Sequence, residues 1–117
     1  YETKPGVGAG RLFGWLVSYH VPEGRAYEIR ESKFFITAKA LKPNDFIVND
    51  RSVSTPHAMV SVTRNGGFMI QDLMSDRGLF IRRRGQETYQ KEEGAVRCGN
   101  GDWIRIGDVE YLLTVVA

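Results

Sequence analysis

Short apolar stretches alternate with turn-forming residues along almost the whole chain. The apolar stretches are rich in Val, Ile, Phe, Tyr and Trp, which suit the half-buried, pleated surface of a sheet. Short runs of this kind, bounded by Gly, Pro, Asn and Asp, are typical of an all-β sandwich or barrel. The pattern predicts ten strands, over residues 12–19, 26–30, 34–37, 46–48, 58–63, 68–72, 79–81, 95–97, 103–106 and 109–116.

The connections between these runs carry the residues that tight turns need. Asn65-Gly66 separates two of the predicted strands and is a strong hairpin signal. Gly107-Asp108 separates the last two, which we expect to form a final hairpin over the core. No apolar period of 3.6 residues persists long enough to predict a major helix.

The composition fits one soluble globular domain. The chain has 117 residues, of which residues 1–10 are predicted to be a flexible tail or linker and residues 11–117 the domain. Sixteen basic and 14 acidic residues give a net charge of +2, without the basic excess of most nucleic-acid binders. No apolar run approaches the ~20 residues that span a bilayer. We therefore expect neither nucleic acid nor a membrane as a partner.

The only cysteine is Cys98, so no internal disulfide can form, and no residue spacing predicts a metal or cofactor site. We expect a buried free thiol and a reducing, cytoplasmic location. The chain begins at Tyr1 instead of a methionine, which we take as a sign that it belongs to a longer protein.

Four segments with fixed order and spacing resemble one known family. They are the segment 37–48, which contains Ala38-Lys39 and Asn44-Asp45-Phe46; Ser54-Thr55-Pro56-His57; Asp72-Leu73-Met74-Ser75-Asp76-Arg77-Gly78-Leu79; and Gly101-Asp102-Trp103-Ile104-Arg105-Ile106-Gly107. The forkhead-associated (FHA) family has a Gly-Arg pair, Asn-Asp-Ile, Ser-x-x-His, Asp-Leu-x-Ser-x-Asn-Gly-Thr and Gly-Asp-x-Ile-x-Ile-Gly in this order. The chain resembles that family from about Gly14 to Val116, as a divergent member.

The resemblance implies a β-sandwich of about eleven strands whose loops at one end bind phosphothreonine in a partner protein. By the same resemblance, Lys39 stands at the position of the phosphate-binding Arg, and Ser54 at that of the Ser that contacts phosphate. Thr55 and Arg77 stand at positions that contact the peptide backbone, and Asp76 at one that can contact phosphate. His57 and Gly78 are expected to support the loops.

The chemistry of these residue types agrees with such a site. A phosphate carries about −1.5 to −2 charges and accepts strong hydrogen bonds. It therefore needs a cation and a hydroxyl donor, which Lys39 and Ser54 can supply. Rigid sandwiches usually display such groups on loops. We therefore predict an interaction module of a larger, signalling protein, with a phosphothreonine peptide as its partner.

The departures from the family pattern fall at the binding positions and leave an alternative open. Lys39 keeps the positive charge of Arg but loses its planar fork. Arg77 can donate to a carbonyl but cannot accept from an N–H group, whereas Asn does both. Asp76 repels phosphate unless Arg77 or Lys39 neutralises it, and Leu79, if exposed, favours an apolar partner. The alternative is a degenerate FHA domain that docks proteins without phosphate or self-associates.

Other polar residues receive a plainer interpretation. Ser54 and His57 are not taken as catalytic, because triads are recognised by geometry and not by proximity in sequence, and the chain has no Gly-x-Ser-x-Gly elbow and no Gly-Lys-Ser phosphate loop; we expect no enzyme activity. Thr3 is considered as a phosphorylation site that would bind in cis. The remaining expectations are an exposed His20 without a partner, packing roles for Trp15 and Trp103, and, for residues 82–84, either a solvated hairpin end or a basic patch beside the loops.

Overall fold

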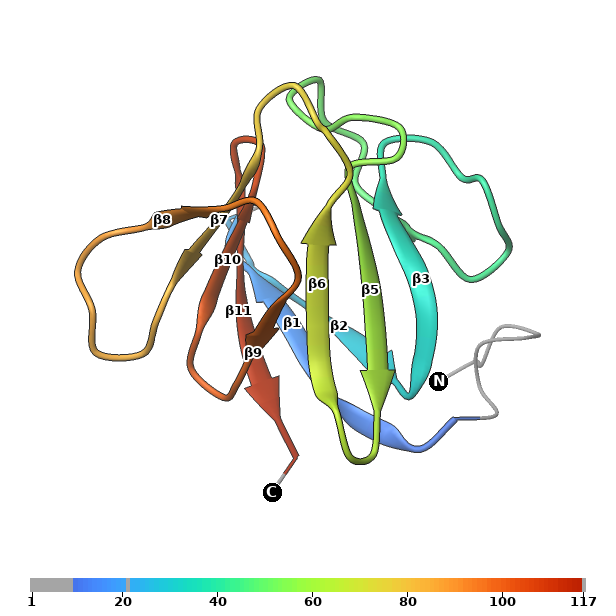
Figure 1. Ribbon diagram of the computed structural model, residues 1–117, viewed down its shortest axis with the longest axis vertical. Helices are drawn as coiled ribbons and strands as arrows, with labels where there is room; N and C mark the ends of the chain where they lie inside the picture. The colour runs from blue at the N-terminus through green and yellow to red at the C-terminus, as the bar shows by residue number, and fades with distance from the viewer. Residues whose placement is uncertain (1–9, 21, 117) are drawn as a thin grey trace.

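The computed structural model describes residues 10–20 and 22–116, which form eleven strands in two sheets (Figure 1). The strands are β1 (Leu12–Ser18), β2 (Arg25–Arg30), β3 (Ser32–Thr37), β4 (Phe46–Ile47), β5 (Ala58–Thr63), β6 (Gly67–Asp72), β7 (Leu79–Arg82), β8 (Gln90–Glu92), β9 (Val96–Cys98), β10 (Trp103–Ile106) and β11 (Val109–Val115). Six strands make one sheet in the order β2-β1-β11-β10-β7-β8, and five make the other in the order β4-β3-β5-β6-β9.

The two sheets pack face to face as a β-sandwich, because the strands that build the core alternate inward apolar residues with outward polar or half-exposed residues. In β10, Ile104 and Ile106 are buried while Trp103 and Arg105 point away from the core. Paired strands are antiparallel except β3 and β4, which run parallel. Phe68, at 0% exposure, is the largest fully buried side chain, and burying a residue of this size stabilises the fold by about 1.5–3 kcal/mol.

All ten predicted strands are present, with boundaries that differ by at most a few residues, and the all-β sandwich class is confirmed. The strand predicted at 95–97 lies at Val96–Cys98. β8 was missed because its sequence, Gln-Lys-Glu, has no apolar residue. It is the outermost strand of its sheet, where one neighbour supplies the backbone hydrogen bonds and no core contact is required.

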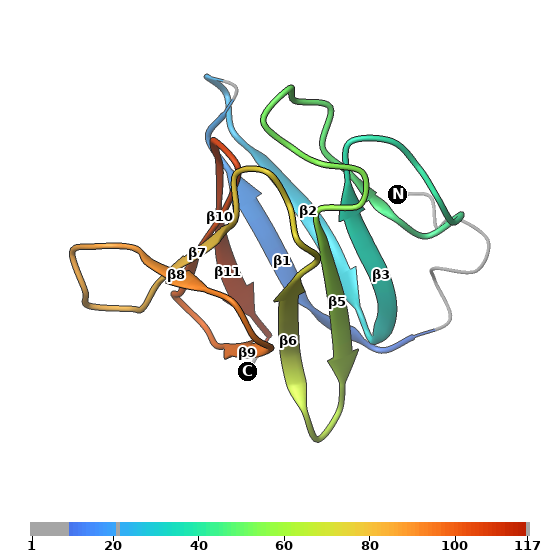
Figure 2. The same ribbon diagram turned by 45° about the horizontal axis from the view of Figure 1, so that its top comes forward.

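Four connections gather at one end of the sandwich, which we call the loop end: residues 38–45, 48–57, 73–78 and 107–108 (Figure 2). Backbone hydrogen bonds join them. Ala38 N donates to Ser54 O at 3.1 Å, and Leu73 N donates to His57 O at 3.0 Å. The β1–β2 turn, which connects Ser18 to Arg25, lies at the same end (Figure 2). The strands thus hold five separate chain segments close together.

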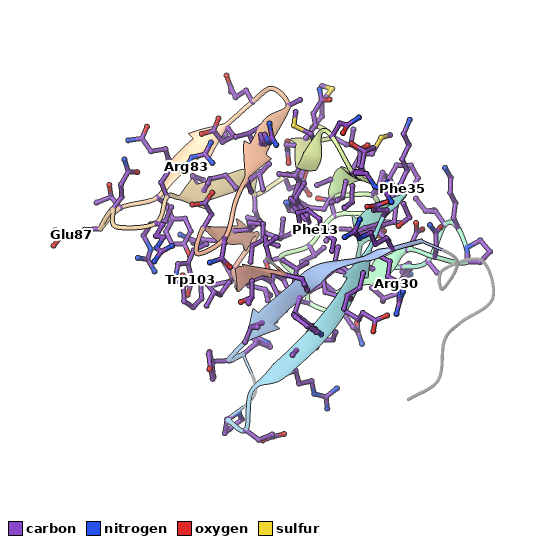
Figure 3. All side chains as sticks on the ribbon, turned by 90° about the horizontal axis from the view of Figure 1, so that it is seen from below. Phe13, Arg30, Phe35, Arg83, Glu87 and Trp103 are labelled. Carbon is purple, nitrogen blue, oxygen red and sulfur yellow. The ribbon has the colours of Figure 1, made fainter. Side chains whose placement is uncertain are left out.

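The arginine run at 82–84 lies away from the loop end, which excludes the interpretation as a basic patch beside the loops. β7 begins next to the loop end, where Leu79 pairs with Ile106, and extends away from it to Arg82, which pairs with Trp103 (Figure 1). Arg83 forms an ion pair of 3.0 Å with Asp102. Figure 3 shows Arg83 and Trp103 on the side of the molecule that carries β7 and β8.

The two tryptophans do not belong to the core. Trp103 is half-buried on the outer face of the six-stranded sheet, where the guanidinium of Arg82 lies 5.3 Å from its ring centroid and 5.6 Å from that of Tyr89. Trp15 lies on the same outer face, since its neighbour Leu16 points inward. Their packing is therefore lateral, along the surface of the sheet.

Cys98 is a buried free thiol, as predicted. Its burial raises the pKa of the thiol to about 12, so the group stays protonated at neutral pH. In the part of the chain that the structure describes, no helix has the length and apolar character that crossing a bilayer requires.

Candidate functional site

Ser54 lies at the loop end and is held by hydrogen bonds within its own loop and to two neighbouring segments. Its carbonyl accepts from Ala38 N at 3.1 Å, its N–H donates to His57 Nδ1 at 3.0 Å, and its Oγ accepts from Asp76 N at 3.1 Å. The hydroxyl proton has no acceptor among the described residues. A hydroxyl donor is therefore held in place by bonds that leave its proton available.

His57 is the fully buried support beneath Ser54. Its exposed fraction is 0%, and its Nε2 atom lies 2.8 Å from Gly78 O. The backbone N–H of Ser54 can only donate and the carbonyl of Gly78 can only accept, so His57 is the neutral tautomer with its proton on Nε2. Both ring nitrogens thus bond to backbone groups. His57 has no free nitrogen to act as a base toward the Ser54 hydroxyl, which agrees with a structural role.

The β6–β7 loop is shaped by a chain of hydrogen bonds around Ser75. Asp72 accepts from the hydroxyl of Ser75 at 2.5 Å and from its N–H at 3.2 Å, and Ser75 Oγ accepts from Gly78 N at 2.9 Å. Gly78 has φ +89°, a left-handed conformation that residues with a Cβ rarely adopt. These contacts present Asp76 and Arg77 at the exposed tip of the loop.

Lys39 stands beside Ser54 at the loop end. Its neighbour Ala38 bonds to Ser54 O, and the Thr37 hydroxyl donates to Lys39 O at 2.7 Å. The side chain is exposed, and the ammonium has no ion-pair partner among the described residues. A free cation and a free hydroxyl donor are therefore carried by adjoining segments.

Arg77 faces a carboxylate that the sequence did not predict. Its Nη1 lies 3.7 Å from Asp108 Oδ2, and Arg105 lies 3.7 Å from the other oxygen of the same carboxylate. The described residues contain no ion pair between Asp76 and Arg77 or Lys39, so of the two possibilities left open by the sequence, neutralisation of Asp76 by a direct ion pair is not found. All partners of this pairing are substantially exposed, and surface ion pairs of this kind contribute little to stability.

Leu79 is fully buried, so the condition under which it would favour an apolar partner, exposure on the loop face, is not met. It is the first residue of β7, and the alternation of this strand points it inward with Ile81. Because the substitution of Thr by Leu in the family pattern falls on the core, it offers no contact to a partner. Thr55, by contrast, is exposed on the loop beside Ser54, as the site requires.

A second polar network, missed by the sequence analysis, connects the β4–β5 loop to the β10–β11 turn. Ser52 Oγ accepts from Asp108 N at 2.8 Å and donates to Asp50 Oδ1 at 2.7 Å. The hydrogen bonds from the hydroxyl and then from the N–H of Ser52 are the main causes that lower the pKa of Asp50. Asp50 also lies 3.7 Å from His20, which is exposed as predicted but does have a partner.

Asn44 and Asp45, which marked the family motif, shape the loop that carries Lys39. Asp45 accepts from the N–H groups of Phe35, Leu41 and Lys42, at 3.1, 2.8 and 2.7 Å. The Asn44 amide donates to Lys33 O at 2.8 Å. Their role here is to fix the loop against the side of β3. Thr3 and most of the predicted tail fall in residues 1–9, outside the described residues.

The described residues contain no cluster of three or more His, Cys, Asp or Glu able to hold a metal ion. The loop end instead presents single charges of both signs, with Lys39 and Arg77 beside Asp76 and Asp108. A rigid β-sandwich that displays a hydroxyl and a free cation on converging loops has the form of a recognition module.

Comparison with known proteins identifies the class. The family model described as the FHA domain matches residues 24–107, and the chain belongs to that family. No curated protein matches the sequence. The family model and the fold therefore define the class of this protein.

Solved structures show the same fold at low sequence identity. The FHA domain of CT664 from Chlamydia trachomatis has a TM-score of 0.74 and 20% identity, over 91% of this chain and 99% of that one. EmbR of Mycobacterium tuberculosis, solved with a low-affinity phosphopeptide, has a TM-score of 0.71 and 24% identity, over 97% of this chain and 27% of that one. A third structure, from a study of phosphothreonine-dependent FHA domain interactions, has a TM-score of 0.70 and 20% identity, over 91% of this chain and 98% of that one.

Proposed function

We propose that this domain binds phosphothreonine in a partner protein through the Ser54 hydroxyl and the Lys39 ammonium. The observation that supports this function is the placement of Ser54, whose backbone and Oγ are fixed by Ala38, His57 and Asp76 while its hydroxyl proton has no acceptor among the described residues. A donor positioned before the ligand arrives loses little conformational entropy on binding.

Other groups at the loop end complete the coordination of a phosphate. The backbone N–H groups of Thr55 and Arg77 have no acceptor among the described residues and can donate to phosphate or peptide carbonyls. Arg77 supplies a further positive charge when it exchanges its 3.7 Å contact with Asp108 for a ligand. Asp76 opposes binding electrostatically, so we expect a modest affinity.

The proposed role is that of a non-catalytic interaction module in a larger signalling protein. Both nitrogens of His57 are occupied by backbone groups, which leaves Ser54 without a base. The cytoplasmic location and the absence of nucleic-acid and membrane partners stay predictions. Phosphate-independent docking or self-association is the alternative, although burial of Leu79 removes one observation that favoured it.

A phosphopeptide library tests the proposal. We expect the domain to select phosphothreonine peptides, with no binding to the same peptides unphosphorylated, and the double variant Lys39→Ala, Ser54→Ala to lose at least about tenfold in affinity, since each contact is charge-assisted. The control carries Lys33→Ala and Ser61→Ala, which remove the same side-chain types from the outer face of the five-stranded sheet. Binding that survives the first double variant, or that does not require phosphate, would favour the alternative.

A further inference from the structure

A small pocket at the loop end is separate from the Ser54 and Lys39 pair. It has a volume of about 110 Å³ and lies between the β1–β2 turn, the β4–β5 loop and the start of β11, segments that Figure 2 shows at the same end. Its lining includes the polar side chains of His20, Arg25, Tyr27, Asn49, Asp50 and Tyr111. Since a water molecule occupies ~30 Å³, the pocket can hold a side-chain head group.

Tyr111 supplies an unused polar group to this pocket. The residue is 4% exposed, and its hydroxyl has no hydrogen-bond partner among the described residues. Among these residues every fully buried side-chain polar atom has a partner, so the small exposed area of Tyr111 must include its hydroxyl. Burial raises the pKa of this phenol, which therefore stays neutral and able to donate. Its ring is fixed against Phe46, 5.4 Å between centroids.

Two further residues supply charged groups to the pocket: Arg25 as a hydrogen-bond donor and Asp50 as an acceptor. Arg25 has no ion pair among the described residues, so its guanidinium can donate at the pocket. Asp50 is ionised, and its Oδ1 accepts two hydrogen bonds from Ser52. Its Oδ2 has only the 3.7 Å contact with His20, so it can accept another hydrogen bond.

The signs of these charges decide which ligand fits. A carboxylate suits Arg25 but is repelled by Asp50, and an ammonium or guanidinium suits Asp50 but is repelled by Arg25. A carboxamide is neutral, accepts through its oxygen and donates through its NH₂ group. It therefore matches Arg25 and Tyr111 on one side and Asp50 on the other without placing like charges together.

We propose that this pocket binds a carboxamide, the head group of an Asn or Gln side chain of the partner. The link to the partner rests on the proposed function, and the position of the pocket supports it. Hydrogen bonds connect Asp50 in the pocket through Ser52 to Asp108, whose carboxylate faces Arg77. The pocket therefore neighbours the loop that carries Arg77, and one peptide can contact both the pocket and the proposed phosphate site. The carboxamide preference itself depends only on the pocket residues.

The first experiment uses small probes and the whole chain, without any phosphopeptide. Acetamide, acetate and guanidinium chloride are titrated separately while backbone amide resonances are followed by NMR. We expect acetamide to shift Asn49 and Asp50 saturably and more strongly than either ion, and Tyr111→Phe to weaken this response about two- to tenfold, the effect of one hydrogen bond. Tyr111→Phe should fold normally because the hydroxyl makes no hydrogen bond to any residue that the structure describes.

Tyr19→Phe is the matched control, because Tyr19 is 69% exposed on the β1–β2 turn and does not line the pocket. It should leave the acetamide response unchanged. The absence of saturable shifts, an equal response to acetate or guanidinium, or a response insensitive to Tyr111→Phe would overturn the proposal.

A second experiment links the pocket to the partner. In a phosphothreonine peptide library, enrichment of Asn or Gln at one position should disappear in Tyr111→Phe while binding still requires Ser54. If the acetamide response is present but phosphothreonine binding is absent, the proposed function fails and the pocket assignment stands. If phosphothreonine binding is present and neither the acetamide response nor the enrichment is found, the pocket assignment fails alone.

Discussion

The Nε2 atom of His57 lies 2.8 Å from the carbonyl oxygen of Gly78, and this contact joins two loops that are 21 residues apart in sequence. On its other side, the same ring accepts from Ser54 N at 3.0 Å. One fully buried side chain therefore sets the distance between the loop that carries the hydroxyl donor and the loop that carries Asp76 and Arg77. The imidazole acts as a spacer with a fixed tautomer.

Replacing His57 by alanine should destabilise the fold. The variant leaves Ser54 N–H and Gly78 C=O without their partner and opens a cavity, and each unsatisfied buried group costs about 1–3 kcal/mol. We expect the free energy of unfolding in urea to fall by about 3 kcal/mol. His20→Ala is the control, because His20 is 57% exposed and has only a 3.7 Å ion pair. Similar losses for the two variants would contradict the structural role of His57.

Gly107 should not tolerate a side chain. It has φ +60°, and a Cβ added there would lie 2.4 Å from Ser52 O. Gly107→Ala should therefore displace the β10–β11 turn from Ser52 and lower the unfolding free energy by about 1–3 kcal/mol. Gly94→Ala, where an added Cβ meets no atom within 4 Å, serves as the control in the same urea unfolding experiment. An equal effect of both substitutions would show that the close approach to Ser52 is unimportant.

The strand pattern could be predicted because inward and outward positions alternate visibly in the sequence. β10 is an example, with Ile104 and Ile106 buried and Trp103 and Arg105 outside. β8 could not be predicted, because an edge strand of polar residues has no alternation to detect. The start of the strand at Leu79 was predicted correctly, but whether its side chain faces the core or the solvent depends on register and was left open by the sequence.

The candidate site residues were proposed from the family resemblance, and their contact with a phosphopeptide stays a prediction, whereas their partners within the chain were not predicted. Lys39 and Ser54 lie at adjoining segments, as the resemblance implied. The pairing of Arg77 with Asp108 joins residues from two loops, and it depends on how the β10–β11 turn is held by Ser52. Such contacts between distant segments arise from tertiary packing, so no local sequence pattern indicates them.

Asp102 should make stability depend on acid pH. Although burial acts to raise the pKa of Asp102, hydrogen bonds from Gly99 N and Arg84 N and the nearby Arg83 hold it below the ordinary value. Because the folded state favours the ionised form, this stabilisation is complete well above pH ~4 and is lost as the pH falls through the folded pKa. We expect Asp102→Asn to cost about 1–3 kcal/mol at pH 7.

The difference between Asp102→Asn and the unmodified chain should then shrink as urea unfolding is repeated at pH values from 7 down to 3. Measuring this difference isolates Asp102, since the other carboxylates titrate equally in both chains. A difference in unfolding free energy that stays constant over this range would show that the charge of Asp102 does not contribute to stability.

Restoring the family's arginine at position 39 should strengthen phosphopeptide binding. Lys39→Arg introduces a planar guanidinium that can hold two phosphate oxygens at once, and we expect about three- to tenfold tighter binding to a phosphothreonine peptide. Arg77→Asn supplies both a donor and an acceptor to the peptide backbone but removes a positive charge near the phosphate, so we expect a smaller change in affinity than for Lys39→Arg. It also removes the contact with Asp108, which is exposed, so stability should change little.

Isothermal titration calorimetry with one selected peptide measures both effects. Lys33→Arg, the same exchange on an exposed lysine of β3, should leave the affinity unchanged. If Lys39→Arg binds no better than Lys33→Arg, then Lys39 does not contact the phosphate, and the cation of the site must be sought at Arg77.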